Sequence, residues 1–196
     1  MKSFLILGHE RSGTGYMAKL MRCFGYAVGH ERVLEDGISA AQFAVRDMPT
    51  AVGPERGGEN FRYVIQVVRH PLDVLASSVH TVSGPMLRKH SKYVDIPTDA
   101  DPVERHLWSI VLWNELISKW QPQLVTHVED AVVNVEGFLR MRQKWKQHNG
   151  LPPTNVNHRD HPPITVNEVM RKVSPMAWHA LQLHSRVYGF SLEDAA

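Results

Sequence analysis

The chain has 196 residues, of which 43% are hydrophobic and 21% charged, and these proportions exclude an intrinsically disordered protein. Its formal net charge is only +2, from 22 basic and 20 acidic residues, so the composition gives no support for a general nucleic-acid or membrane binder, and only a local basic pocket stays open. The length predicts one domain over residues 1–196.

The single cysteine, Cys23, excludes a disulfide framework within the chain and favours a cytoplasmic location. No stretch of the sequence approaches the roughly 18 apolar residues of a membrane span, so we expect no such span.

Short apolar runs and helical periodicity alternate in the first part of the chain. Residues 4–8 are typical of a strand buried on both faces, and residues 14–25 have helical spacing with Gly25 as the stop. Residues 26–31 predict a short strand, residues 37–48 a helix, and residues 53–60 a loop.

The same alternation continues to the C-terminus. The expected elements are a strand at 62–70, a helix at 71–80, an irregular segment at 81–100, an amphipathic helix at 101–120, a strand at 123–130, a helix at 134–148, a loop at 149–165 and a helix at 175–188. Such alternation predicts an α/β fold, a three-layer sandwich whose central parallel sheet carries helices on both faces.

A glycine-rich stretch, "GHERSGTGY", joins the first predicted strand to the first helix. Gly8 and Gly13 have the spacing of a nucleotide-binding P-loop, but Thr14 replaces the lysine and a basic residue, Arg11, stands inside the loop. Backbone N–H groups and the helix dipole converge at such a position, and Arg11 adds planar donors suited to phosphate or sulfate oxygens. The stretch therefore predicts an anion site.

A second signal lies at the end of the strongest predicted strand, in "VVRHPLDVLASSV". Arg69 ends the strand and Ser77 follows eight residues later, inside the next helix. Ligands of parallel sheets bind at the carboxyl ends of the strands. We therefore expect Arg69 and the Arg11 loop to face one crevice.

Together the two motifs resemble those of sulfotransferases that use 3′-phosphoadenosine 5′-phosphosulfate (PAPS), including bacterial, phage and carbohydrate-type members. The family loop [K/R]-S-G-T-[T/S] corresponds to the five residues Arg11, Ser12, Gly13, Thr14 and Gly15, and the family strand-end motif R-x-P-x-D corresponds to Arg69–Asp73. The resemblance implies a P-loop-like loop that binds the 5′-phosphosulfate, with Arg69 and Ser77 on the 3′-phosphate. It also implies that Arg159 is a candidate for the C-terminal closing segment.

The resemblance further implies an enzyme that moves a sulfuryl group in line from PAPS to an acceptor hydroxyl or amine of a small molecule or carbohydrate. Arg11 would stabilise charge in the transition state, and no metal is expected. An acceptor hydroxyl needs a general base, for which Glu31 is favoured over His30 at the end of the second predicted strand. His80 and His90 are lesser candidates.

Three features depart from the family pattern. Gly15 replaces a hydroxyl residue, Glu10 puts a carboxylate beside Arg11, and a closing segment rich in Lys, Gly and Arg is not recognisable. Two alternatives therefore stay open: a P-loop nucleoside or nucleotide kinase with an atypical loop, and a nucleotide-binding sulfotransferase-like protein without turnover. We expect Glu10 to point away from the anion or to pair with a basic side chain.

Overall fold

The chain forms two compact units in the structure, a computed structural model. The first unit comprises Met1–Val68 and Ile117–His158, and the second comprises Arg69–Leu116 and Arg159–Ala196. The structure describes residues 1–45, 61–81, 84–143, 150–152 and 161–192, with the backbone alone for 84–86. A single sulfotransferase-like domain over 1–196 stays a prediction.

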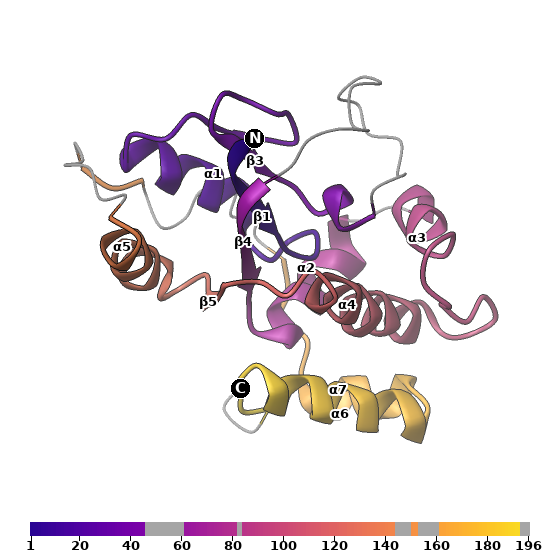
Figure 1. Ribbon diagram of the computed structural model, residues 1–196. Coiled ribbons are helices and arrows are strands. Elements are labelled where there is room, and N and C mark those ends of the chain that lie inside the picture. The colour runs from indigo at the N-terminus through magenta and orange to yellow at the C-terminus, as the bar shows by residue number, and fades with distance from the viewer. Residues whose placement is uncertain (46–60, 82–83, 144–149, 153–160, 193–196) are drawn as a thin grey trace. The chain divides into compact units, whose positions relative to one another are not determined.

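A five-stranded, all-parallel sheet forms the centre of the first unit (Figure 1). Its strands are β1 (Lys2–Leu7), β2 (Val28–His30), β3 (Gly37–Ser39), β4 (Phe61–Val68) and β5 (Leu124–His127), in the order β2-β3-β1-β4-β5. The predicted α/β fold with a parallel sheet is thereby confirmed. Because β1 is the middle strand, the loop that follows it lies at the centre of the sheet's carboxyl edge.

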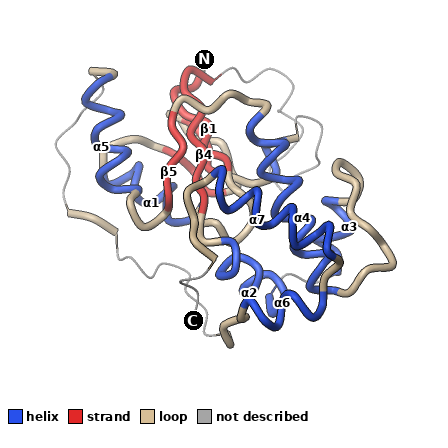
Figure 2. The backbone as a smooth tube through the Cα atoms, turned by 90° about the horizontal axis from the view of Figure 1, so that it is seen from below, coloured by secondary structure: helices blue, strands red, loops and turns tan. Residues whose placement is uncertain are grey.

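Two helices of this unit, α1 (Thr14–Cys23) and α5 (Ala131–Met141), lie on the same side of the sheet (Figure 2). Their apolar stripes share one core with the strands, which includes Phe4, Ile6, Met17, Leu20, Ile65, Val135 and Phe138. The prediction of helices on both faces of the sheet stays a prediction.

The predicted helix over 37–48 is wrong in its described part. Residues 37–39 form strand β3, and one turn of 3₁₀ helix follows at Gln42–Ala44, while 46–48 and the predicted loop at 53–60 lie outside the described residues. β3 pairs with β1 on one side and β2 on the other, which buries Ile38 completely. A three-residue strand is too short to show a period in the sequence, so only its pairing reveals it.

The second unit is helical. It contains α2 (Pro71–Thr81), α3 (Gly84–His90), most of α4 (Pro102–Ser118), α6 (Val166–Lys172) and α7 (Pro175–Val187). Asp101 caps α4, since the Val103 N–H donates to Asp101 Oδ1 at 2.8 Å. Among the described helices of the chain, none is both long and apolar enough to cross a bilayer.

Two helices of this unit were not predicted. α3 falls within the segment expected to be irregular, and α6 follows the predicted loop. The beginning of α6 did carry a signal, because Thr165 and Glu168 form a capping box in which each side chain accepts from the other residue's backbone N–H. Both helices have seven residues, and helices this short depend on packing more than on periodicity.

Candidate functional site

The β1–α1 loop, residues 8–13, joins the central strand of the first unit to the N-terminus of α1. The Ser12 N–H donates to the His9 carbonyl at 3.0 Å, which closes a tight turn, and Arg11 within it has a positive φ of 73°. Gly13 occupies the N-cap position with φ 102°, and Thr14 is the first helical residue. The predicted order of strand, glycine loop and helix is therefore confirmed.

Gly13 is needed here for space as well as for conformation. A Cβ atom on Gly13 would lie 2.5 Å from Cγ2 of Val128, which follows β5. Because glycine has no side chain, nothing on the N-cap residue competes for the first N–H groups of α1. These donors suit an anion at the helix N-terminus.

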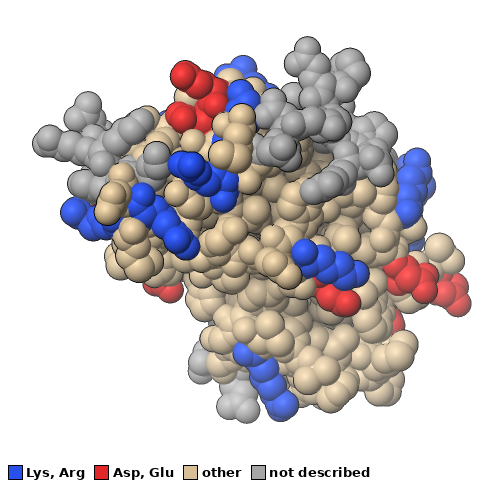
Figure 3. All heavy atoms as spheres, viewed as in Figure 1, with Lys and Arg blue, Asp and Glu red and all other residues tan. Residues whose placement is uncertain are grey.

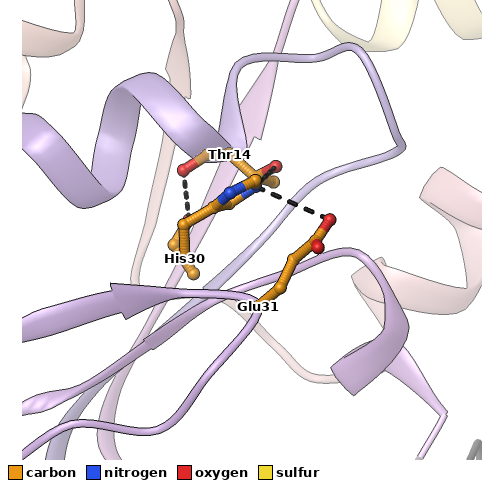
Figure 4. A network of polar contacts seen from close by, with 4 residues as sticks. Thr14, His30 and Glu31 are labelled. Carbon is orange, nitrogen blue, oxygen red and sulfur yellow. Dashed lines mark hydrogen bonds and ion pairs between the residues drawn. The ribbon is translucent and has the colours of Figure 1, made fainter. Parts of the chain in front are cut away.

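Thr14 connects the loop to the end of β2. Its Oγ1 lies 3.4 Å from Nε2 of His30, and the same nitrogen lies 3.8 Å from a carboxylate oxygen of Glu31 (Figure 4). The Ser39 hydroxyl at the end of β3 donates to the Thr14 carbonyl at 2.7 Å. Three strand ends therefore meet at the beginning of α1, where His30 lies beside Thr14 and Glu31 lies beside His30.

The His30 ring lies in an environment that favours its neutral form. Burial lowers the pKa of His30, the Glu31 carboxylate raises it, and Arg22 and Lys19 lower it further, with a net decrease from 6.5. At neutral pH the imidazole is therefore uncharged and has a lone pair that can accept a proton. The Glu31 side chain is more exposed, at 56%, and its residue has a positive φ of 57°.

The other loop side chains differ in exposure. Ser12 and Thr14 are buried, whereas Arg11 and the two glycines Gly13 and Gly15 are partly exposed. Glu10 is buried too, at 9% exposure. The Arg11 side chain is therefore accessible to solvent, although Glu10, Ser12 and Thr14 beside it are buried.

Arg69 and Ser77 belong to the second unit, so their expected crevice with the Arg11 loop stays a prediction. Arg69 directly follows β4, and its Nη2 lies 3.4 Å from Oδ2 of Asp73, one helical turn on. Ser77 is buried within α2, and its carbonyl accepts a hydrogen bond from the Thr81 hydroxyl. The ion pair with Asp73 orients the guanidinium group of Arg69.

The lesser candidates for a base, His80 and His90, each lie against another aromatic ring of the second unit. His90 stacks on Trp113 at 4.0 Å between ring centroids, and its Nδ1 lies 2.6 Å from the Ser109 hydroxyl. His80 stacks on His161 at 6.1 Å. Arg159, predicted in a closing segment, lies outside the described residues.

Ser39 is the residue of this site that the sequence interpretation missed. The sequence pattern predicts a helix at Ser39, whereas this residue ends β3 opposite His30 of β2 and Ile6 of β1. No local pattern identifies a serine in this role, because the role comes from the order of the strands.

Comparisons of this chain with family models, curated proteins and solved structures found no match.

Proposed function

We propose that this chain is a sulfotransferase that moves a sulfuryl group from PAPS to an acceptor hydroxyl or amine. The observation that carries the proposal is the contact between Thr14 Oγ1 and His30 Nε2, 3.4 Å apart. It brings the hydroxyl of an R-S-G-T loop together with a proton acceptor at the carboxyl edge of a parallel sheet.

The residues of the loop fit the anionic end of PAPS. The N-terminal N–H groups of α1 and the Thr14 hydroxyl are hydrogen-bond donors, and Arg11 adds a permanent positive charge. When bound, PAPS supplies the activated sulfuryl group. The chain's task is then to position the reactants and to neutralise charge on the leaving phosphate, and it needs no covalent intermediate for this.

His30 and Glu31 provide the general base of the proposal. A neutral His30 can take the proton of the acceptor hydroxyl, and the Glu31 carboxylate at 3.8 Å stabilises the imidazolium that results. Glu31 is the alternative base, with His30 as its neighbour. The proposal includes a small-molecule or carbohydrate acceptor, a cytoplasmic location and a three-layer sandwich with a P-loop-like loop.

The first prediction concerns binding of adenosine 3′,5′-bisphosphate, which we expect to raise the melting temperature of the protein without magnesium. Arg69→Ala should weaken this binding by about 1.5 to 3 kcal/mol, or roughly 10- to 150-fold, because a charged hydrogen bond is lost. Arg62→Ala, an exposed arginine of β4, is the control and should keep full affinity. Calorimetric titration measures both variants.

Other outcomes would point elsewhere. Unchanged affinity of Arg69→Ala would remove Arg69 from the 3′-phosphate. A thermal response only to ATP with magnesium would favour the kinase alternative, and no response to either nucleotide would contradict a PAPS site.

The second prediction concerns the base. We expect His30→Ala or Glu31→Gln to lower the rate of sulfuryl transfer by about 10² to 10⁴-fold, while the affinity for the bisphosphate is kept. Because the pKa of His30 is lowered, its basic form persists into mildly acidic solution, and the rate should fall only below pH 6.5. Transfer of ³⁵S from labelled PAPS to a set of sugars, phenols and peptides measures the rate. If both variants keep full activity, the base lies elsewhere.

A further inference from the structure

Helix α7 has two apolar faces, only one of which is buried. Ala177 and Leu181 are completely buried in the core of the second unit. On a second face Met176, Leu183 and Val187 are exposed by 67%, 47% and 76%. Packing in the core accounts for the apolar residues of the first face, but it does not account for those of the second face.

The exposed side chains form one stripe. Met176, Leu183 and Val187 are spaced by seven and four residues, which places them on the same side of a helix. The stripe is about 16 Å long at 1.5 Å per residue. Single exposed apolar residues are ordinary, but an aligned set marks an interaction surface. We call Met176, His179, Leu183, Arg186 and Val187 the α7 face.

Although Glu104 of α4 accepts hydrogen bonds from Ser174, the N-cap of α7, the α7 face itself carries no acidic residue. Arg186 lies on it, and Arg171 and Lys172 end α6 three residues before α7 begins. All three side chains are exposed. The only acidic residue in the described segment 161–192 is Glu168, whose carboxylate accepts from the N–H and hydroxyl of Thr165. Figure 3 shows the region at the bottom of the view, where α6 and α7 lie in Figure 1, as mostly uncharged with a basic side chain on it.

We propose that the α7 face docks on an anionic lipid bilayer. Apolar side chains enter the boundary between headgroups and acyl chains, while Arg171, Lys172 and Arg186 pair with lipid phosphates and carboxylates. The long stems of these cations cover apolar surface while their charged ends stay in water.

The composition of the face favours a bilayer over an acidic protein partner. The exposed residues of α7 include no serine, threonine, asparagine, glutamine or tyrosine. Protein interfaces usually carry about ten direct hydrogen bonds, for which such side chains are needed. A bilayer needs only apolar area and positive charge. This inference does not depend on the proposed transferase activity.

Flotation of the full chain with lipid vesicles tests the proposal. We expect binding to phosphatidylserine–phosphatidylcholine vesicles, little binding to phosphatidylcholine alone, and weaker binding at high salt. Val187→Ser and Leu183→Ser together should abolish flotation, and Arg186→Gln should weaken binding by about fivefold.

Val133→Ser is the matched control, because Val133 on α5 is 74% exposed and belongs to the first unit. It should float like the unaltered chain, and all variants should keep the same unfolding midpoint in urea, since these side chains are exposed. Equal binding to both vesicle types, no binding to either, or binding that survives the double substitution would overturn the proposal. None of these readouts involves sulfuryl transfer, so failure here leaves the proposed function untouched.

Discussion

A Gly37→Ala variant is expected to lose more than about 4 kcal/mol of its free energy of unfolding, which places it among the most damaging single substitutions. Gly37 begins β3 opposite Phe4 of β1, with φ 147°. An added Cβ would lie 1.9 Å from the Phe4 carbonyl oxygen and 2.8 Å from the Phe4 carbonyl carbon. Both are backbone atoms of the central strand, so no side chain can turn aside to make room.

The backbone around Gly37 has little freedom to relax. The N–H groups of Ser3 and Phe4 both donate to the Asp36 carbonyl, at 3.0 and 2.8 Å. Separating β3 from β1 would break these hydrogen bonds and expose Ile38, which is completely buried. Since natural domains are stable by only about 5 to 15 kcal/mol, a substantial unfolded fraction should result.

Gly137→Ala is the control for this prediction. Gly137 lies within α5, and a Cβ there would have nothing within 4 Å. Alanine should therefore stabilise the helix by about 0.5 to 1 kcal/mol. Urea unfolding followed by circular dichroism compares the two variants, and equal stability of Gly37→Ala and the unaltered chain would contradict the position of β3.

Acidification is expected to destabilise the second unit through two buried histidines. His106 on α4 and His184 on α7 are 5% and 7% exposed. Burial lowers the pKa of His184 from 6.5 to about 4. Burial also lowers the pKa of His106 to about 4, assisted by the positive charge of Arg105 and by His90.

The direction of the effect follows from proton binding. Between pH 6.5 and about 4 the unfolded chain binds protons at both histidines, whereas the folded chain does not. The free energy of unfolding therefore falls as the pH falls through this window, by up to about 3 kcal/mol for each histidine.

The carboxylate of Glu104 acts at lower pH. Burial alone would raise its pKa, but hydrogen bonds from the Ser174 hydroxyl and N–H and from Trp108 lower it below 4.5. Its contribution to stability is therefore present above pH 4.5 and is lost as the pH falls below 4.5 through this lowered pKa.

Chemical unfolding at a series of pH values between 4 and 7.5 measures this dependence. His106→Gln and His184→Gln should each reduce the slope of stability against pH in that range, whatever they do to stability at pH 7.5. His179→Gln is the control, because His179 lies on the exposed face of α7 and should leave the slope unchanged. A slope that is the same in all three variants would contradict buried, neutral histidines.

Local patterns were enough to predict the elements that carry strong signals. The apolar run of β1, the strand-forming run of β4 and the helical spacing of α4 and α7 are each contained within one short stretch of the sequence. The β1–α1 loop was recognised for the same reason, since its glycines and Arg11 are consecutive in the sequence. The loop of the candidate site could therefore be predicted from the sequence.

Other features depend on contacts between distant residues. Strand β3 exists because Gly37 and Ile38 fit between β1 and β2, and a helix was expected where they lie. The contact between Thr14 and His30, sixteen residues apart, depends on β2 and β3 being inserted on one side of β1. The type of an element and its approximate limits depend on residues that are close in the sequence. The hydrophobic period and the capping residues are therefore enough to predict them. Strand order, and with it the side chains that meet at a sheet edge, comes from the packing of the whole unit.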